Sequence, residues 1–389
     1  MEKTRKRKAP LFFMNELNED LLEKVLSWLP PASFFCLRSV CRRWGSVVSS
    51  PSFLLACSQI PFRAPWFLMV DENLDHSIFF DSSEWNWKSL NRPCSLNQAS
   101  YIPIASAGGL LCFRSASGEL MAWNPVTGAG RQLPPSGETQ ALQALAMSSS
   151  AKDPSSYRIT LISGSPPNLS FRTFHSEKNL WEDEVTLASK PETDTVSGGA
   201  GGAVYFLNKS GDVVAANMQR NPSKQFSSVV TTDDGDELVY FLSPSGAVVA
   251  CNLTSRSFLE LPRLMPFGSE YSVDVVASRG EMLVVLLSEF FGTASLRMWR
   301  FAKEERLWRQ AAAMPPAMSH EFFGKKIDIN CVGCGDLIFI CLNSSEFSSS
   351  VVCNVVANEW IELPQCVVKG KAKEFISAFS FEPRLELSL

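Results

Sequence analysis

Histidine and cysteine carry most of the chemistry that this 389-residue chain could perform, so their spacing is the first guide to function. The three histidines are His76, His175 and His320, and none lies in an H-E-x-x-H pattern or beside a serine or cysteine nucleophile motif. The sequence also lacks a P-loop and a G-x-S-x-G elbow. Cys331 and Cys334 form a C-x-x-C pair, but a structural zinc site needs four ligands, and a turn leading into a strand explains the pair more simply. We therefore predict no catalytic residue, no metal site and no cofactor.

The composition narrows the class of protein. Hydrophobic residues make up 45% and charged residues 20% of the chain, as in soluble globular proteins. The net charge of −4 argues against direct nucleic-acid binding, and without a run of 18 apolar residues no membrane span is predicted. Eleven cysteines without a regular framework indicate a reducing compartment, and the N-terminus lacks the apolar core of a secretory signal. We expect an intracellular protein of the nucleus, the cytoplasm or both.

Residues 17–53 have the apolar periodicity of short amphipathic helices. Asn18 is a predicted N-cap, and Pro30 and Pro31 end the first helix because proline has no N–H to donate. A second apolar stripe, up to Ser50 and Pro51, fits one continuous helix or two short ones, and we expect three helical pieces in all. A unit this small is marginal alone and usually needs a partner or a neighbouring domain.

The order of residues in this stretch resembles the F-box. The matching motifs are Leu17-x-x-x-Leu21-Leu22-x-x-Val25-Leu26-x-x-Leu29-Pro30, then Leu37-Arg38-Ser39-Val40-Cys41-Arg42-Arg43-Trp44, then Ser50-Pro51-x-Phe53. The resemblance implies docking on a Skp1-like adaptor, and through it on a cullin–RING ubiquitin ligase core. The implied Skp1 contacts are Leu17, Leu21, Leu22, Val25, Leu26, Leu29, Pro30, Leu37, Val40 and Trp44. Some of these must instead pack the helices together, and the sequence does not separate the two roles.

From Trp66 onward the chain repeats a pattern of β-rich runs, polar turns, an aromatic residue and often Leu-Pro. The seven units are residues 66–87, 108–134, 157–181, 201–226, 237–262, 281–308 and 336–364. A period of 40–50 residues with about four short strands is typical of a β-propeller blade, and we expect the post-turn aromatics to pack between blades. We predict seven blades, although a short step of 32 residues between Phe226 and Phe258 leaves six or eight open.

The last strand of the repeat region and its Gly-Gly pairs indicate how the ring closes and which family the repeats resemble. Residues 375–381 form an orphan strand that we expect to pair into the first blade, because closure removes exposed edges. The Gly-Gly pair of kelch repeats occurs only at Gly108-Gly109 and Gly201-Gly202. An F-box followed by such degenerate repeats resembles the plant-type F-box/kelch-repeat proteins. We therefore predict a multidomain protein, a small all-α F-box followed by an all-β propeller.

The predicted domains are a basic tail, an F-box, a linker and a propeller, at residues 1–10, 11–57, 58–65 and 66–389. The tail is either a nuclear-import signal or a solvated segment, and its basic residues are Lys3, Arg5, Lys6, Arg7 and Lys8. Two turns with paired aromatics should lie together on one propeller face, and their rings are candidate anchors for a protein target. These rings are Phe290, Phe291, Phe322 and Phe323.

The resemblance implies a substrate-recognition subunit of a Skp1–cullin–F-box ligase, which needs no catalytic group of its own. Its contribution would be proximity, since tethering target and charged enzyme makes their reaction nearly intramolecular. Two alternatives stay open. One is a non-degradative adaptor or transcriptional co-regulator built from the same modules. The other, least favoured because no acidic, histidine or metal constellation is found, is a propeller enzyme or lectin. The identity of the protein target is left open.

Overall fold

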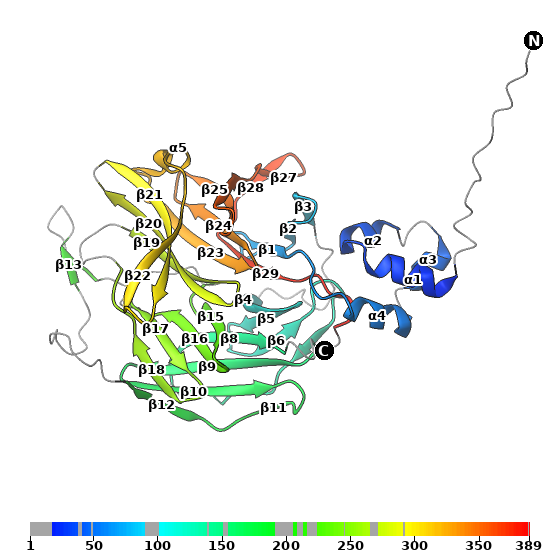
Figure 1. The fold of residues 1–389 in the computed structure, drawn as a ribbon, viewed down its shortest axis with the longest axis horizontal. Helices are drawn as coiled ribbons and strands as arrows, with labels where there is room; N and C mark the ends of the chain where they lie inside the picture. Colours follow the sequence, from blue (N-terminus) through cyan, green and yellow to red (C-terminus); the bar gives the residue numbers. More distant parts are fainter. Residues whose placement is uncertain are drawn as a thin grey trace, which may run out of the picture. The chain divides into compact units, whose positions relative to one another are not determined.

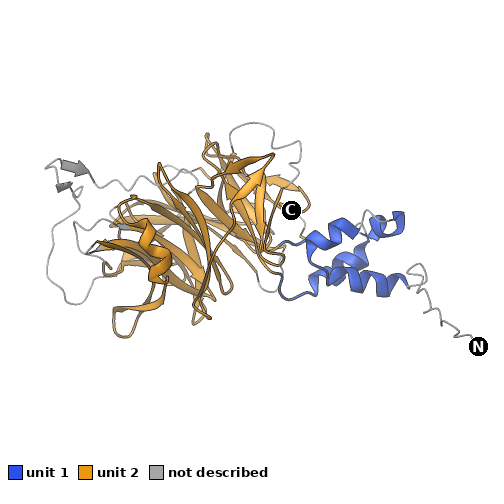
Figure 2. Cartoon of the chain, turned by 90° about the horizontal axis from the view of Figure 1, so that it is seen from above, with its two compact units in different colours: residues 1–63, 383–386 blue, residues 64–382, 387–389 orange. Residues whose placement is uncertain are grey.

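The computed structural model describes two compact units, shown in separate colours in Figure 2. The helical unit comprises residues 1–63 and 383–386, and the propeller unit comprises residues 64–382 and 387–389. The described residues are 18–37, 41–47, 50–89, 101–137, 140–150, 155–190, 205–207, 213–215, 224–244, 246–264, 271–290, 292–387 and 389. These units differ from the predicted domains, because most of the expected linker and a short segment near the C-terminus belong to the helical unit. The basic tail lies outside the described residues.

Four helices form the described part of the N-terminal region, where three pieces were expected: α1 (Glu19–Ser27), α2 (Pro31–Leu37), α3 (Arg42–Val47) and α4 (Pro51–Ser58). The extra helix arises because Pro51 occupies the first turn of α4 rather than ending the preceding stripe, and proline is well tolerated there. Phe34 and Phe53 stack in the core with ring centroids 5.1 Å apart. The buried apolar residues of this unit are Leu22, Leu26, Phe34, Trp44, Val47, Phe53 and Cys57.

The described part of the propeller unit contains six four-stranded antiparallel groups, which can be followed in Figure 1. Strands are given from the innermost outward. The first group is β29 (Ser377–Phe381), β1 (Trp66–Val70), β2 (Ile78–Asp81) and β3 (Asn86–Ser89), and the second is β4 (Tyr101–Ala107), β5 (Leu110–Ser115), β6 (Leu120–Trp123) and β7 (Gly130–Gln132). The third is β8 (Leu142–Ser149), β9 (Tyr157–Ser165), β10 (Asn168–His175) and β12 (Val185–Ser189), and the short β11 (Leu180–Trp181) also pairs with β10.

The next three groups continue around the ring. The fourth group is β15 (Ser228–Asp233), β16 (Asp236–Leu242), β17 (Val248–Asn252) and β18 (Ser257–Glu260). The fifth is β19 (Tyr271–Ser278), β20 (Glu281–Phe290), β21 (Thr293–Ala302) and β22 (Leu307–Ala313), and the sixth is β23 (Asp328–Cys334), β24 (Leu337–Asn343), β25 (Ser348–Asn354) and β26 (Glu359–Glu362). Two hairpins lie outside these groups, β13 (Tyr205–Leu207) with β14 (Val213–Ala215) and β27 (Cys366–Val368) with β28 (Lys371–Lys373). The parallel pairing of β12 with β18 joins the third and fourth groups at their outer strands.

The ring closes as predicted, because β29 near the C-terminus pairs antiparallel with β1, where Leu68 lies opposite Phe379. The innermost strands β29, β4, β8, β15, β19 and β23 contact one another in that order around the ring. The described residues therefore make six blades, not the seven that we favoured. The predicted unit at 201–226 lies mostly outside the described residues. β8 contacts β15 directly, where Ser228 Oγ at the start of β15 donates to Leu145 O of β8 at 2.8 Å.

Tryptophan side chains tie neighbouring blades together at the recurring Leu-Pro. The indole N–H groups of Trp181 and Trp308 donate to Pro134 O and Pro262 O of the preceding blade, at 2.9 and 2.7 Å. This confirms the predicted inter-blade packing at these two positions. In the first blade the donor to Pro364 O is Trp87, at 2.8 Å, rather than the predicted Trp85. The Leu-Pro thus supplies a carbonyl acceptor for the next blade.

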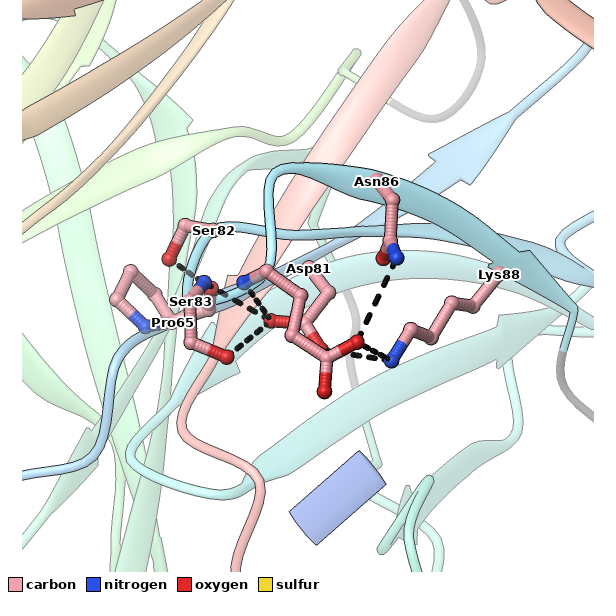
Figure 3. A network of polar contacts seen from close by, with 7 residues as sticks. Pro65, Asp81, Ser82, Ser83, Asn86 and Lys88 are labelled. Carbon is pink, nitrogen blue, oxygen red and sulfur yellow. Dashed lines mark hydrogen bonds and ion pairs between the residues drawn. The ribbon is translucent and has the colours of Figure 1, made fainter. Parts of the chain in front are cut away.

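An Asx turn closes the hairpin between the third and fourth strands of several blades. Figure 3 shows the first of these turns, where the fully buried Asp81 accepts from Ser83 N at 2.9 Å and lies 3.3 Å from Lys88 Nζ. Asn124 and Asn354 accept two backbone N–H groups each at the corresponding positions. Such side chains replace backbone hydrogen bonds within the tight turn, which explains why Asp or Asn stands at the end of these strands or directly after it.

Candidate functional site

Helix α1 has one buried and one exposed apolar face. Leu22 and Leu26 are 1% and 2% exposed and belong to the core of the helical unit. Leu21 and Val25 are each 51% exposed, and Trp28, at the C-cap of the helix, is 66% exposed. Because residues four and seven positions apart share one face of a helix, these three side chains form a continuous apolar strip. We call Leu21, Val25 and Trp28 the α1 strip.

The predicted contact residues fall into three groups. Leu22, Leu26 and Trp44 are buried and pack the helices together. Leu21, Val25 and Pro30 are exposed, whereas Leu29 and Leu37 are partly buried against the same core. Leu17 and Val40 lie outside the described residues. Sequence reasoning missed Trp28, although its position seven residues after Leu21 was a sufficient signal.

Both ends of α1 are held by side chains. The Asn18 carboxamide accepts a hydrogen bond from Asp20 N at 3.4 Å, as predicted for an N-cap, and Glu19 and Asp20 place negative charge in the first turn. At the other end the buried Arg63 guanidinium donates to Ser27 O at 2.9 Å and to Leu29 O at 3.3 Å. Arg63 therefore satisfies carbonyls that the helix end leaves without intrahelical donors, on both sides of Trp28.

The two aromatic turns of the propeller lie together, as expected from its topology, because Gly324 N donates to Glu289 Oε1 at 3.0 Å. Their four rings do not form one exposed cluster. Phe322 is 3% exposed and packs in the core, 5.7 Å from the ring of Phe347, which corrects its prediction as an anchor. Phe323 is 47% exposed. The short 3-10 turn over residues 320–322 directs one ring inward and leaves the next outside.

The other two predicted anchors are Phe290 and Phe291. Phe290 ends β20, and nothing is described of its side chain; Phe291 lies outside the described residues. Phe323 is thus the predicted anchor that the structure places at the surface.

A cavity of about 420 Å³ occupies the centre of the propeller. It is lined by the innermost strands, at residues 104–107, 147–149, 228–232, 275–277, 331–333 and 379–380, together with Lys224. The Lys224 ammonium donates to Cys331 O at 2.6 Å and lies 4.0 Å from Asp274 Oδ2. Lys224 precedes the fourth blade, and its two partners lie on the fifth and sixth blades. The ammonium therefore joins three blades, which is a structural role.

Cysteine and histidine form no centre in the part of the chain that the structure describes, where no three His, Cys, Asp or Glu side chains are grouped to hold a metal ion. Cys331 and Cys334 both lie on β23, and burial raises the pKa of the Cys334 thiol to about 12. The pair is therefore part of a strand rather than the turn that we expected before one. Within the same described ranges, no helix has the length and apolar character needed to cross a membrane.

Comparison with known proteins assigns both units. Residues 14–55 match the F-box domain family, and residues 79–332 match the KIB1-4 beta-propeller family. The chain is 49% identical to F-box only protein 13 of Arabidopsis thaliana, over 98% of this chain and 87% of that protein. It is 26% identical to an F-box/kelch-repeat protein of the same plant, over 98% and 92% of the two chains. It is 24% identical to Protein UNUSUAL FLORAL ORGANS, also of Arabidopsis thaliana, over 95% and 85%.

Proposed function

This chain belongs to the F-box proteins that carry a KIB1-4 beta-propeller, and we propose that it is the substrate-recognition subunit of a Skp1–cullin–F-box ubiquitin ligase. In this role the helical unit binds a Skp1-like adaptor and the propeller captures a protein target. The family relationship supports a non-catalytic adaptor role in general. Adaptor binding is assigned to the surface of the helical unit and target capture to the surface of the propeller.

The observation that carries the proposal is the α1 strip. Three large apolar side chains on one helix face are half exposed or more, although a core lies directly beneath them. Exposed apolar surface of this kind on a small domain marks a site for a partner. A tryptophan among them adds to the case, because tryptophan is enriched among the residues that dominate binding energy.

We expect the double substitution Leu21→Asp and Val25→Asp to abolish Skp1 binding while leaving the helical unit folded. Both side chains are 51% exposed, so the carboxylates remain solvated in the free protein but would be desolvated in an apolar interface. The loss should exceed about 100-fold in affinity, as for interface hot spots. Titration calorimetry with purified Skp1 measures it.

Leu307→Asp is the matched control, because Leu307 is 60% exposed in the propeller unit. This variant should bind Skp1 as the wild type does. Equal affinity of the wild type and the double variant would overturn the assignment of the α1 strip. A wild type that binds no Skp1 would overturn the proposed function itself.

For target capture we expect Phe323→Ser to reduce recovery of the target at least tenfold, a loss of the size produced by an aromatic interface anchor. Phe322→Ser should instead destabilise the propeller, because Phe322 is packed in its core. The measurement is quantitative mass spectrometry of proteins crosslinked to each full-length variant, with Skp1 recovery as the internal standard. Unchanged recovery with Phe323→Ser would remove this residue from the target surface. A captured protein whose half-life does not depend on the chain would favour the non-degradative adaptor.

A further inference from the structure

The helical unit contains a segment from the other end of the chain. Residues Pro383–Glu386 belong to this unit, although they follow the closing strand of the propeller. Leu385 packs against the helical core, to which all four helices contribute. The side chains of Arg384 and Glu386 are only 8% and 6% exposed, and they pair with each other at 3.0 Å. Two ionised side chains this deeply buried indicate a specified contact, since desolvating charges is costly unless they are paired.

Arg384 holds the chain segment that follows α4. Its guanidinium donates to Ile60 O at 3.3 Å and to Pro61 O at 3.5 Å, in addition to its pairing with Glu386. Arg63 follows this segment two residues later. Holding the carbonyls of Ile60 and Pro61 therefore fixes the point from which the Arg63 side chain reaches α1.

Arg63 connects this segment to the end of α1 that bears Trp28 of the α1 strip. It is 7% exposed, and its hydrogen bonds to Ser27 O and Leu29 O lie on either side of Trp28. Arg63 and Glu386 both lie near the Cys57 thiol: burial raises its pKa to about 11, Arg63 opposes this rise and Glu386 adds to it. One acid from the C-terminal segment thus lies in the same buried region as the guanidinium that caps α1.

We propose that Pro383–Glu386 is an integral part of the helical unit and positions the Trp28 end of α1 for adaptor binding. Arg384 and Arg63 are positioning residues in this arrangement, each acting through backbone carbonyls rather than on the adaptor. The inference deepens the proposed function and rests on it for its binding consequence. A fragment limited to the N-terminal region would lack this support, and its α1 strip would be displayed on a looser helix.

The test uses the full-length chain and the variant Arg384→Ala, which removes the contacts to Ile60 O and Pro61 O and leaves Glu386 unpaired. We expect amide hydrogen exchange in the last turn of α1 to accelerate about tenfold or more and Skp1 affinity to fall about tenfold, given the cost of breaking a buried pair. Exchange in the propeller strands should be unchanged. Arg384→Lys, which keeps the charge beside Glu386 but not the two-pronged donor, should give an intermediate loss.

Arg279→Ala is the matched control, because Arg279 is an exposed propeller arginine paired with Asp336. It should change neither readout. Wild-type exchange and wild-type affinity in Arg384→Ala would overturn the inference. The exchange readout needs no Skp1, so the positioning role is tested even where the wild type fails to bind the adaptor, an outcome that overturns the proposed function alone.

Discussion

Replacing Gly333 with alanine is expected to open the seam between the fifth and sixth blades. A Cβ atom at position 333 would lie 1.9 Å from Ala277 O and 3.0 Å from Ala277 C. Both are backbone atoms of the facing innermost strand, so no side chain can rotate away to make room. We expect the free energy of unfolding to fall by roughly 3 kcal/mol, the upper range for overpacking a core. Urea unfolding of the full-length protein measures the change.

Gly130→Ala is the control for this prediction. Gly130 also lies on a strand, and its added Cβ would meet its nearest atoms, in Met121 and Trp123, at 3.5 Å, an ordinary contact distance. Its urea midpoint should stay close to that of the wild type. Equal midpoints for the two alanine variants would contradict the close approach of β19 and β23.

Gly333 also illustrates why part of the propeller was visible in the sequence and part was not. Six of the seven predicted repeats correspond to strands that lie outward of the innermost strand of a blade, where polar turns and Leu-Pro recur. The innermost strands share no such signal, because they face the central cavity and their neighbours' inner strands rather than a recurring turn. Position 333 requires glycine because β23 packs closely against β19 there. This packing is determined by the closure of the ring and not by the local sequence pattern.

The prediction of seven blades was wrong for a related reason. Residues 201–226 have the Gly-Gly pair and apolar runs of a blade, and Phe226 occupies the expected post-turn position. In the structure Phe226 instead precedes β15, and its carbonyl accepts from Leu145 N of the preceding blade. Local composition thus resembles a repeat, although the innermost strands on either side of this segment, β8 and β15, contact each other directly. The closing strand was predictable because a ring leaves one unpaired segment that must find a partner.

The α1 strip shows the same limit in the helical unit. Leu21 and Leu22 are adjacent, as are Val25 and Leu26, so helical periodicity alone places apolar residues on two neighbouring faces. Only the packing of α4 and the other helices decides that Leu22 is buried and Leu21 exposed. The contribution of Arg384 was beyond sequence reasoning, since its contact with Ile60 joins residues 324 positions apart.

Asp274→Ala is expected to lower the free energy of unfolding by about 3 to 5 kcal/mol, the cost of leaving one buried charge unpaired. Asp274 is 4% exposed, and its carboxylate accepts from Cys331 N at 2.7 Å and from Val275 N at 2.9 Å. Its removal leaves the Lys224 ammonium, itself 5% exposed, without a counter-charge at 4.0 Å. Asp336→Ala, which breaks a pair exposed by half or more, should cost only about 0 to 1 kcal/mol.

A double-mutant cycle separates the charge effect from the lost hydrogen bonds. Lys224→Met removes the ammonium and keeps an unbranched apolar chain of similar length. If the unpaired charge dominates, adding Lys224→Met to Asp274→Ala recovers stability, and the two substitutions are strongly non-additive. If the lost acceptors for Cys331 N and Val275 N dominate, the two costs add. An Asp274→Ala variant as stable as Asp336→Ala would show that this buried pair does not hold the fourth, fifth and sixth blades together.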